Sequence, residues 1–139
     1  EAVRNSSTNV IEQENLLLVS RPGVGKLAIA PFAVAISQDF TGIYVKQAKL
    51  IVEFLFFYFD YNSEVLRTQN QGTSIQGITR DKLASIPIPV PNLPEQTAIA
   101  AVLADMDAEL AALEAKAAKA RLLKQGMMQE LLTGRIRLL

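Results

Sequence analysis

The chain contains no cysteine and no histidine among its 139 residues. Without cysteine it has no disulfide framework and no thiol nucleophile, and without either residue it lacks the usual zinc ligands. A triad with an imidazole base is excluded for the same reason. Carboxylate chemistry remains open, but no pair of Asp or Glu residues stands out. The composition therefore predicts no catalytic residue, no metal site and no cofactor.

An excess of charge is also missing, because 14 acidic residues balance 14 basic ones. Proteins that bind DNA alone are usually basic, since neutralising phosphates supplies most of the non-specific affinity. The balance argues against strong autonomous DNA binding. It leaves open that the chain reads DNA inside a larger complex whose other subunits supply positive charge.

Long apolar runs are absent as well. The most apolar stretch, residues 50–59, is interrupted by Glu53 and is too short to cross a bilayer. The first residues include neither an initiator methionine nor a basic leader with a cleavage site. We expect a fragment of a longer, soluble, cytoplasmic protein.

The chain divides into two parts near residues 87–94. In the first part, short apolar runs bounded by turn residues predict strands over 15–20, 26–30 and 33–37. The run 47–58 lacks turn residues and predicts a buried helix, so that its aromatic residues are interpreted as core rather than as a base-stacking surface. Thr79 is placed to cap one helical turn. Residues 1–92 are expected to form a small mixed α/β domain.

Proline at every second position of residues 86–91 requires an extended segment, interpreted as a strap between two folded parts. A proline-rich ligand for a partner domain is the alternative. Pro94 is suited to the first turn of a helix and Gly134 to its C-terminal cap. We therefore expect one long helix within residues 93–139, and an α+β fold for the whole chain.

Apolar residues recur along this helix with heptad spacing, interrupted at Lys124. Acidic residues occupy the first part of the helix and basic residues the later part. This gradient suits the helix dipole, and it also favours an antiparallel over a parallel partner helix. The partner is a second copy or a similar helix from a missing half. The predicted pairing interface comprises Ile99, Leu103, Met106, Leu110, Leu113, Ala117, Ala120, Met127 and Leu131.

Two segments carry candidate DNA contacts. Residues 21–26 resemble a phosphate-binding loop, but Ser20 and Leu27 stand where that motif needs Gly and Ser or Thr, so a hairpin is favoured over nucleotide binding. Its cations are placed to reach a DNA phosphate. Residues 67–76 are the densest run of hydrogen-bonding side chains, suited to base edges, although an ordinary polar loop is the alternative. The candidate DNA-binding residues are Arg21, Lys26, Gln69, Gln71, Thr73, Ser74 and Gln76.

The order of these motifs resembles the C-terminal part of a DNA specificity subunit of type I restriction-modification systems, over nearly the whole chain. The motifs are Arg21-Pro22-Gly23-Val24-Gly25-Lys26, Gln71-Gly72-Thr73-Ser74-Ile75-Gln76-Gly77-Ile78-Thr79, Ile86-Pro87-Ile88-Pro89-Val90-Pro91, Leu93-Pro94-Glu95-Gln96 and Gln125-Gly126-Met127-Met128-Gln129-Glu130-Leu131-Leu132-Thr133-Gly134-Arg135-Ile136.

The resemblance implies a non-catalytic subunit of an adenine methyltransferase and endonuclease complex. Residues 1–92 would be part of a target-recognition domain that reads one half of a split DNA site, and residues 93–139 a conserved spacer helix. The implied partners are DNA, the methyltransferase subunit, the restriction subunit indirectly, and a second copy or half through an antiparallel coiled coil. The alternative is a purely structural coiled-coil module without DNA contact.

Overall fold

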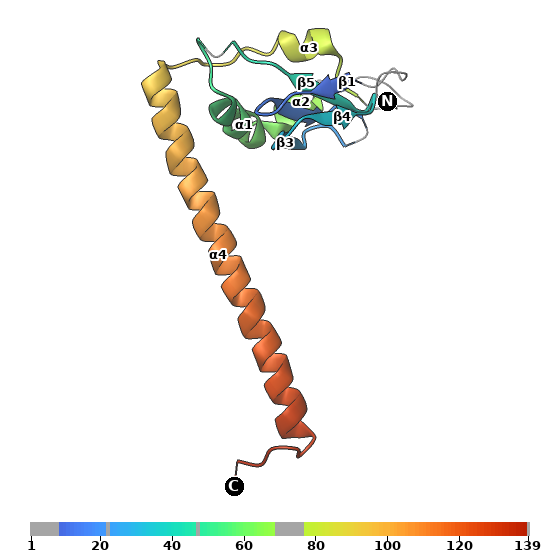
Figure 1. The fold of residues 1–139 in the computed structure, drawn as a ribbon, viewed down its shortest axis with the longest axis vertical. Coiled ribbons are helices and arrows are strands. Elements are labelled where there is room, and N and C mark those ends of the chain that lie inside the picture. The colour runs from blue at the N-terminus through green and yellow to red at the C-terminus, as the bar shows by residue number, and fades with distance from the viewer. Residues whose placement is uncertain (1–8, 22, 47, 69–76, 139) are drawn as a thin grey trace. The chain divides into compact units, whose positions relative to one another are not determined.

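The computed structural model describes residues 9–21, 23–46, 48–68 and 77–138. The chain forms two compact units, Glu1–Ala100 and Ala101–Leu139. Figure 1 shows the elements in chain order: β1 (Asn9–Ile11), β2 (Leu16–Val19), β3 (Leu27–Ile29), β4 (Val34–Ile36), β5 (Phe40–Ile43), α1 (Val52–Tyr61), α2 (Ser63–Thr68), α3 (Arg80–Ala84) and α4 (Leu93–Leu132).

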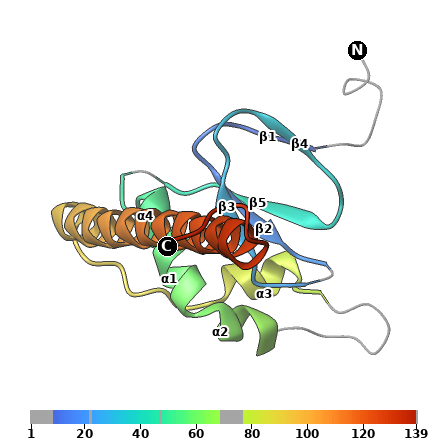
Figure 2. The ribbon, with the colours of Figure 1, turned by 90° about the horizontal axis from the view of Figure 1, so that it is seen from below.

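Two small antiparallel sheets form the β part of the first unit (Figure 2). In one sheet β2 lies between β3 and β5, with Leu16 opposite Ile29 on one side and Ile43 on the other. In the other sheet β1 pairs with β4, with Val10 opposite Ala35. Leu16 and Leu18 of β2 are completely buried, whereas Leu17 and Val19 between them are half-buried. This alternation follows from the period of a strand.

Helix α1 completes the main core of this unit. Leu55 and Phe59 lie one helical turn apart and pack with Leu16 and Leu18 of β2. The interpretation of the aromatic run as core holds for Phe54 and Phe59, which are buried. A second, smaller core cluster contains Ile11, Ala30 and Ile36.

The strap of residues 86–91 runs along this core. Ile86 and Ile88 pack against the main cluster, and the hydroxyl of Tyr58 donates to the carbonyl of Pro87 at 3.2 Å. Before the strap, the Thr79 side chain accepts from the backbone N–H of Lys82 and caps α3, as the sequence predicts. The strap is therefore part of the folded unit rather than a free ligand segment.

Helix α4 contains 40 residues, which corresponds to a length of about 60 Å at 1.5 Å per residue. It ends before Gly134, whose positive φ of 74° suits a C-terminal cap. No helix among the described residues is long and apolar enough to cross a membrane.

The predicted α+β fold is confirmed, and the three predicted strands correspond to β2, β3 and β4. The helix predicted over 47–58 begins later than expected, at Val52, and extends to Tyr61. The sequence analysis did not predict β1, β5 or α2. The predicted division into a recognition domain, 1–92, and a spacer helix, 93–139, stays a prediction, and the two compact units divide after Ala100. The first turns of α4 thus belong to the first unit.

Candidate nucleic-acid interface and helix-pairing surface

The glycine-containing segment joins β2 to β3 as a hairpin. These strands are antiparallel, and the backbone N–H of Val19 donates to the carbonyl of Lys26 at 2.9 Å. Gly23 and Gly25 have φ values of +84° and +104°, which side chains disfavour. Because a strand follows Lys26 rather than a helix, the segment lacks the helix N-terminus of a phosphate-binding loop. The hairpin prediction is confirmed.

Arg21 lies at the base of this hairpin, between two other segments. Its Nη2 donates to the carbonyl of Gln38 at 3.2 Å, and its backbone N–H donates to the carbonyl of Asp39 at 3.1 Å. Its side-chain stem covers Gly77, where an added Cβ would meet the Arg21 Cδ at 2.9 Å. A guanidinium has five N–H donors. Among the described residues, the Gln38 contact uses one of these donors.

Two further cations adjoin the same hairpin loop. Lys26 is exposed. Gly25 approaches the side chain of Arg67, whose Nε would lie 3.5 Å from a Cβ added at Gly25. Arg67 also pairs with Glu64 at 2.6 Å, and 56% of its side chain is exposed. Sequence reasoning did not select Arg67, because its proximity to Gly25 depends on a contact between distant segments.

The polar candidates Gln69, Gln71, Thr73, Ser74 and Gln76 lie outside the described residues, so their DNA contacts stay predictions. The described residues that bracket this segment are informative, however. Arg67 on one side adjoins Gly25, and Gly77 on the other side packs under Arg21. The described residues Arg67 and Gly77 thus lie against the loop and the base of the hairpin, respectively.

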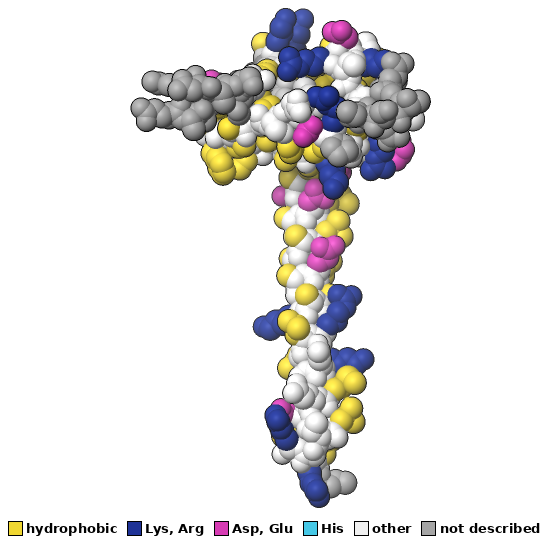
Figure 3. Space-filling model, turned by 90° about the vertical axis from the view of Figure 1, so that its right-hand side faces the viewer, with side chains coloured by type: hydrophobic (Ala, Val, Ile, Leu, Met, Phe, Trp, Pro, Cys, Tyr) yellow, Lys and Arg dark blue, Asp and Glu magenta, His cyan; other side chains and the backbone are white. Residues whose placement is uncertain are grey.

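The predicted pairing residues of α4 form a largely uncovered apolar surface. Met106 and Leu110 are each 56% exposed and Leu113 is 53% exposed. Met127 and Ala120 are also exposed, while Ile99, Leu103, Ala117 and Leu131 are half-buried. Figure 3 shows acidic side chains in the first part of α4 and basic ones further along. A free helix with this surface leaves the apolar residues in water, which favours a partner helix.

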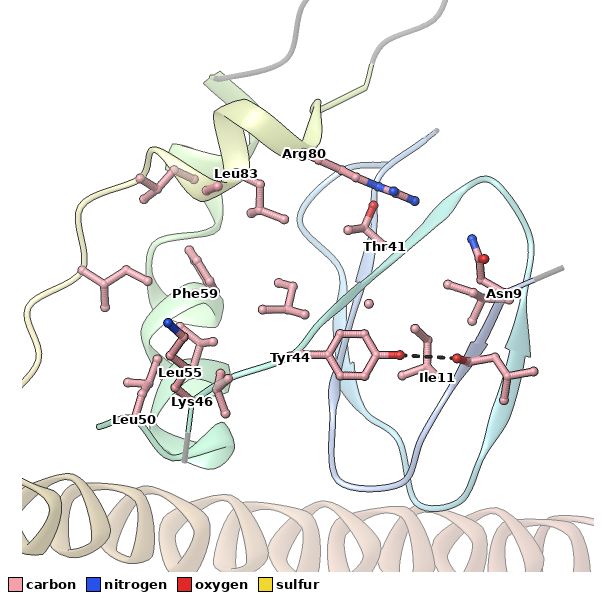
Figure 4. Close-up of a pocket in the computed structure, with 18 residues that line it drawn as sticks. Asn9, Ile11, Thr41, Tyr44, Lys46, Leu50, Leu55, Phe59, Arg80 and Leu83 are labelled. Atoms are coloured by element: carbon pink, nitrogen blue, oxygen red, sulfur yellow. Dashed lines mark hydrogen bonds between the residues drawn. The ribbon is translucent and has the colours of Figure 1, made fainter. Parts of the chain in front are cut away.

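A separate apolar cavity of about 660 Å³ opens within the first unit (Figure 4). It lies between the two core clusters, with Ile11 of one and Phe59 of the other in its wall. Lys46 and Arg80 are the charged residues in its lining, and the Tyr44 hydroxyl donates to the carbonyl of Val10 at 3.3 Å. The lining contains no carboxylate. In the described parts of the chain, no group of three or more acidic residues is placed to hold a metal ion.

With the hairpin loop, the strap and the long helix described, the chain can be compared with known protein families. Residues 1–123 match the model of the type I restriction modification DNA specificity domain. The chain belongs to this family. The resemblance inferred from the proline run and the helix end is therefore confirmed.

Relatives in the same family come from Methanocaldococcus jannaschii. The putative type I restriction enzyme MjaX specificity subunit is 33% identical over 133 residues, which cover 96% of this chain and 31% of the relative. The MjaVIII specificity subunit is 27% identical, over 94% of this chain and 31% of its own length. The chain thus spans about a third of the length of these relatives.

Solved structures show the same fold. A chain from a study of complex assembly and conformational transition of the type I R-M system has a TM-score of 0.75 at 24% identity, covering 90% of this chain and 32% of that one. The HsdS subunit from Thermoanaerobacter tengcongensis has a TM-score of 0.67 at 25% identity, covering 87% and 30%. The S subunit from M. genitalium has a TM-score of 0.69 at 21% identity, covering 89% and 33%.

Proposed function

We propose that this chain is part of the DNA-recognition subunit of a type I restriction-modification complex, where it reads one half of a split site and catalyses nothing itself. Family membership supports this role. The single structural observation that carries it concerns the described residues on either side of residues 69–76: Arg67 adjoins Gly25 in the hairpin loop, and Gly77 packs against Arg21 at the base of the hairpin. This bracketing supports a surface on which the cations of the hairpin and the proposed base-reading segment act together.

The two parts of this surface have different tasks. Arg21, Lys26 and Arg67 contact phosphates, because cations position a protein on the duplex without reading its sequence. The amide side chains Gln69, Gln71 and Gln76 read base edges, since a glutamine pairs with adenine through two hydrogen bonds. Thr73 and Ser74 supply further hydroxyl contacts to bases or phosphates.

The long helix assembles the complex. Its apolar heptad surface pairs with an antiparallel helix from a second copy or from the other half of a longer subunit, because this direction places the acidic part of one helix beside the basic part of the other. The helix also docks the methyltransferase subunit, through which the restriction subunit joins indirectly. The expected compartment is the cytoplasm, where such a complex meets its DNA.

The test begins with co-expression of the chain and a methyltransferase subunit from the same system. We expect co-purification at a defined stoichiometry, after which DNA selection yields the target site. In that complex, replacing both Gln71 and Gln76 with Ala should relax the sequence preference. Lys26→Ala should instead weaken binding to all sequences about equally and reduce the salt slope by about 1.

The alternative function is a structural coiled-coil module without DNA contact. The zero net charge and the exposed helix surface favour it. A chain that forms a homodimer but ignores the methyltransferase subunit would support this alternative. So would an intact complex whose DNA affinity is unchanged after the double glutamine substitution.

A further inference from the structure

Gln96, near the beginning of α4, has a completely buried polar side chain. A buried amide is costly unless hydrogen bonds replace those it made with water. Ser20 is the other buried polar residue in the described part of the chain, and its exposure is 4%. The burial of Gln96 therefore requires an explanation in its contacts.

The Gln96 amide joins three backbone segments. Its Oε1 accepts from the backbone N–H of Ile51 at 3.0 Å. Its Nε2 donates to the carbonyl of Lys49 at 2.9 Å and to the carbonyl of Pro91 at 2.8 Å. One side chain thus connects α4 to the segment before α1 and to the end of the proline strap. Both amide hydrogens and the carbonyl oxygen are used.

The contact with Ile51 satisfies the backbone N–H of a helix N-cap residue, which is the role of the Glu or Gln side chain in a capping box. Ile51 is the N-cap residue of α1, and its own side chain makes no capping hydrogen bond. Helix α4 needs no such help, because Asn92 Oδ1 already accepts from the Glu95 N–H at 3.0 Å. Gln96 is therefore not required to start α4, and its role is to attach that helix.

Ala100 strengthens this interpretation. It lies one helical turn after Gln96 on the same face, and it is 5% exposed. Beyond it, Ala101 and Val102 are exposed. Within residues 93–100 of α4, Gln96 and Ala100 are buried and Leu93 and Ile99 are half-buried, so Gln96 lies at the centre of the face that attaches the beginning of α4 to the first unit.

We infer that Gln96 is a positioning residue that fixes where α4 leaves the recognition unit, and that it thereby sets the distance between half-sites which the assembled complex accepts. This inference rests on the proposed function. If the first turns of α4 detach, the helix no longer leaves the recognition unit at one defined place. The complex then tolerates several spacings instead of selecting one.

The choice of glutamine can be tested with Gln96→Glu. A carboxylate accepts from the Ile51 N–H but has no donor for the carbonyls of Lys49 and Pro91, so a buried charge faces two acceptors. Glu95→Gln makes the opposite change at the exposed neighbouring position and is the matched control. Gln96→Met keeps the length of the side chain without adding charge, and serves if the glutamate variant fails to fold.

The main measurement is the affinity of the full complex for duplexes whose half-site spacing changes one base pair at a time. We expect the wild type and Glu95→Gln to prefer one spacing. In the Gln96 variants, the ratio of the affinity for this spacing to the affinity for other spacings should fall about tenfold. Their affinity for a single half-site should stay unchanged. Hydrogen exchange of the Ile51 amide in the full chain should accelerate by a similar factor.

The outcomes separate this inference from the proposed function. If the Gln96 variants keep the wild-type spacing preference, Gln96 has no positioning role. If the wild-type complex binds no DNA, the proposed function fails, while exchange at Ile51 still reports whether the amide holds the helix. Unchanged exchange at Ile51 in Gln96→Met would overturn the attachment itself.

Discussion

Ser20 lies under the glycine hairpin, where its hydroxyl and its backbone N–H both donate to the carbonyl of Asp39, at 2.9 and 2.7 Å. Its own carbonyl accepts from the N–H of Ile78 at 3.3 Å. Ser20 therefore connects the hairpin, the turn before β5 and the chain that follows the polar segment. The candidate DNA surface depends on such contacts between loops.

We predict that Ser20→Ala lowers the free energy of unfolding by about 1 kcal/mol, because it removes one buried hydrogen bond. Ser85→Ala is the matched control, since the Ser85 hydroxyl also donates to a backbone carbonyl, that of Lys82, but is exposed. Urea unfolding of both variants measures the difference. Equal losses in the free energy of unfolding at the two positions would show that burial does not strengthen the contribution of the Ser20 hydrogen bond.

Gly77 provides a second test at the scale of single residues. A Cβ added there would meet the Arg21 side chain and, at 3.0 Å, the carbonyl oxygen of Ser20. We expect Gly77→Ala to destabilise the first unit by about 1–3 kcal/mol through crowding. The same change at Gly126, where a Cβ meets nothing within 4 Å, should stabilise helix α4 by up to about 1 kcal/mol.

Denaturant unfolding of the two glycine variants, followed by circular dichroism, measures both shifts. Opposite signs are expected because one position is crowded and the other is an open helical site. A stable Gly77→Ala protein would mean that Arg21 can move away from Gly77 at no cost. The proposed contact surface would then not need this packing.

The predictability of the candidate site differed from residue to residue. Arg21 and Lys26 were chosen as candidates because glycines and turn residues near them are local signals of a hairpin. Arg67 was included in the polar run 67–76 but not among the candidates, because its approach to Gly25 joins positions that are far apart in the sequence. Gln96 was noted only as part of a family motif, since its burial depends on Lys49 and Ile51, which are equally distant.

Among the secondary-structure elements, prediction was most successful where the local pattern was strong. The long helix was expected from heptad spacing, Pro94 and Gly134, and the structure has it as α4. Strand β5 includes Gly42, which weakens any strand pattern, and it is held by pairing with β2. Strand β1 has three residues and depends on β4. Both strands are stabilised by pairing with distant strands, so a local sequence pattern does not reveal them.

The beginning of α1 illustrates the same limit. The run of apolar residues favoured a helix from residue 47, but Ile51 has an extended backbone with φ −99° and ψ 147°. Its N–H donates to Gln96 instead of entering a helical hydrogen bond. The start of α1 at Val52 thus coincides with a hydrogen bond from Ile51 to Gln96, a residue 45 positions away, which periodicity within the run does not reveal.

The pairing surface of α4 allows a sharp comparison within one element. We predict that Leu110→Glu prevents helix pairing, because it places a charge within the apolar heptad surface. Leu122→Glu is the matched control, since Leu122 is 70% exposed and lies off that surface. Analytical ultracentrifugation over a range of concentrations should show a monomer for the first variant and wild-type association for the second.

Two results would contradict this assignment. Unchanged association of Leu110→Glu would mean that the heptad surface is not the interface. Loss of association in Leu122→Glu would place the interface on another face of the helix. High salt should weaken wild-type pairing only modestly if apolar contacts dominate, since screening acts mainly on exposed charges.

At the scale of the whole molecule, the zero net charge constrains how the chain meets DNA. A phosphate-binding protein gains affinity by releasing counterions, and its binding constant falls with salt according to the number of phosphates contacted. The hairpin surface offers three cations, Arg21, Lys26 and Arg67, and Arg67 is partly neutralised by Glu64. The chain alone should therefore bind DNA weakly.

We predict that the salt dependence of DNA binding is shallow for the chain alone and steep for the complex with its methyltransferase subunit. Three phosphate contacts correspond to a log–log slope of about −2.7 at most, because each contact contributes about −0.9. Fluorescence anisotropy with one DNA duplex over a series of salt concentrations measures both slopes. The comparison of the two slopes is informative because the proposed DNA-reading residues of this chain are the same in both samples.

The difference between the two slopes shows whether this chain or its partner subunits supply most of the cations that contact phosphates. A steeper slope in the complex means that partner subunits supply most phosphate contacts, while this chain contributes selection among sequences. Lys26→Ala should then reduce both slopes by about the same amount, near 1. The isolated chain could instead show the full slope of the complex. That result would mean that the chain has a strongly basic surface despite its zero net charge, and that electrostatic attraction to DNA does not depend on the partner.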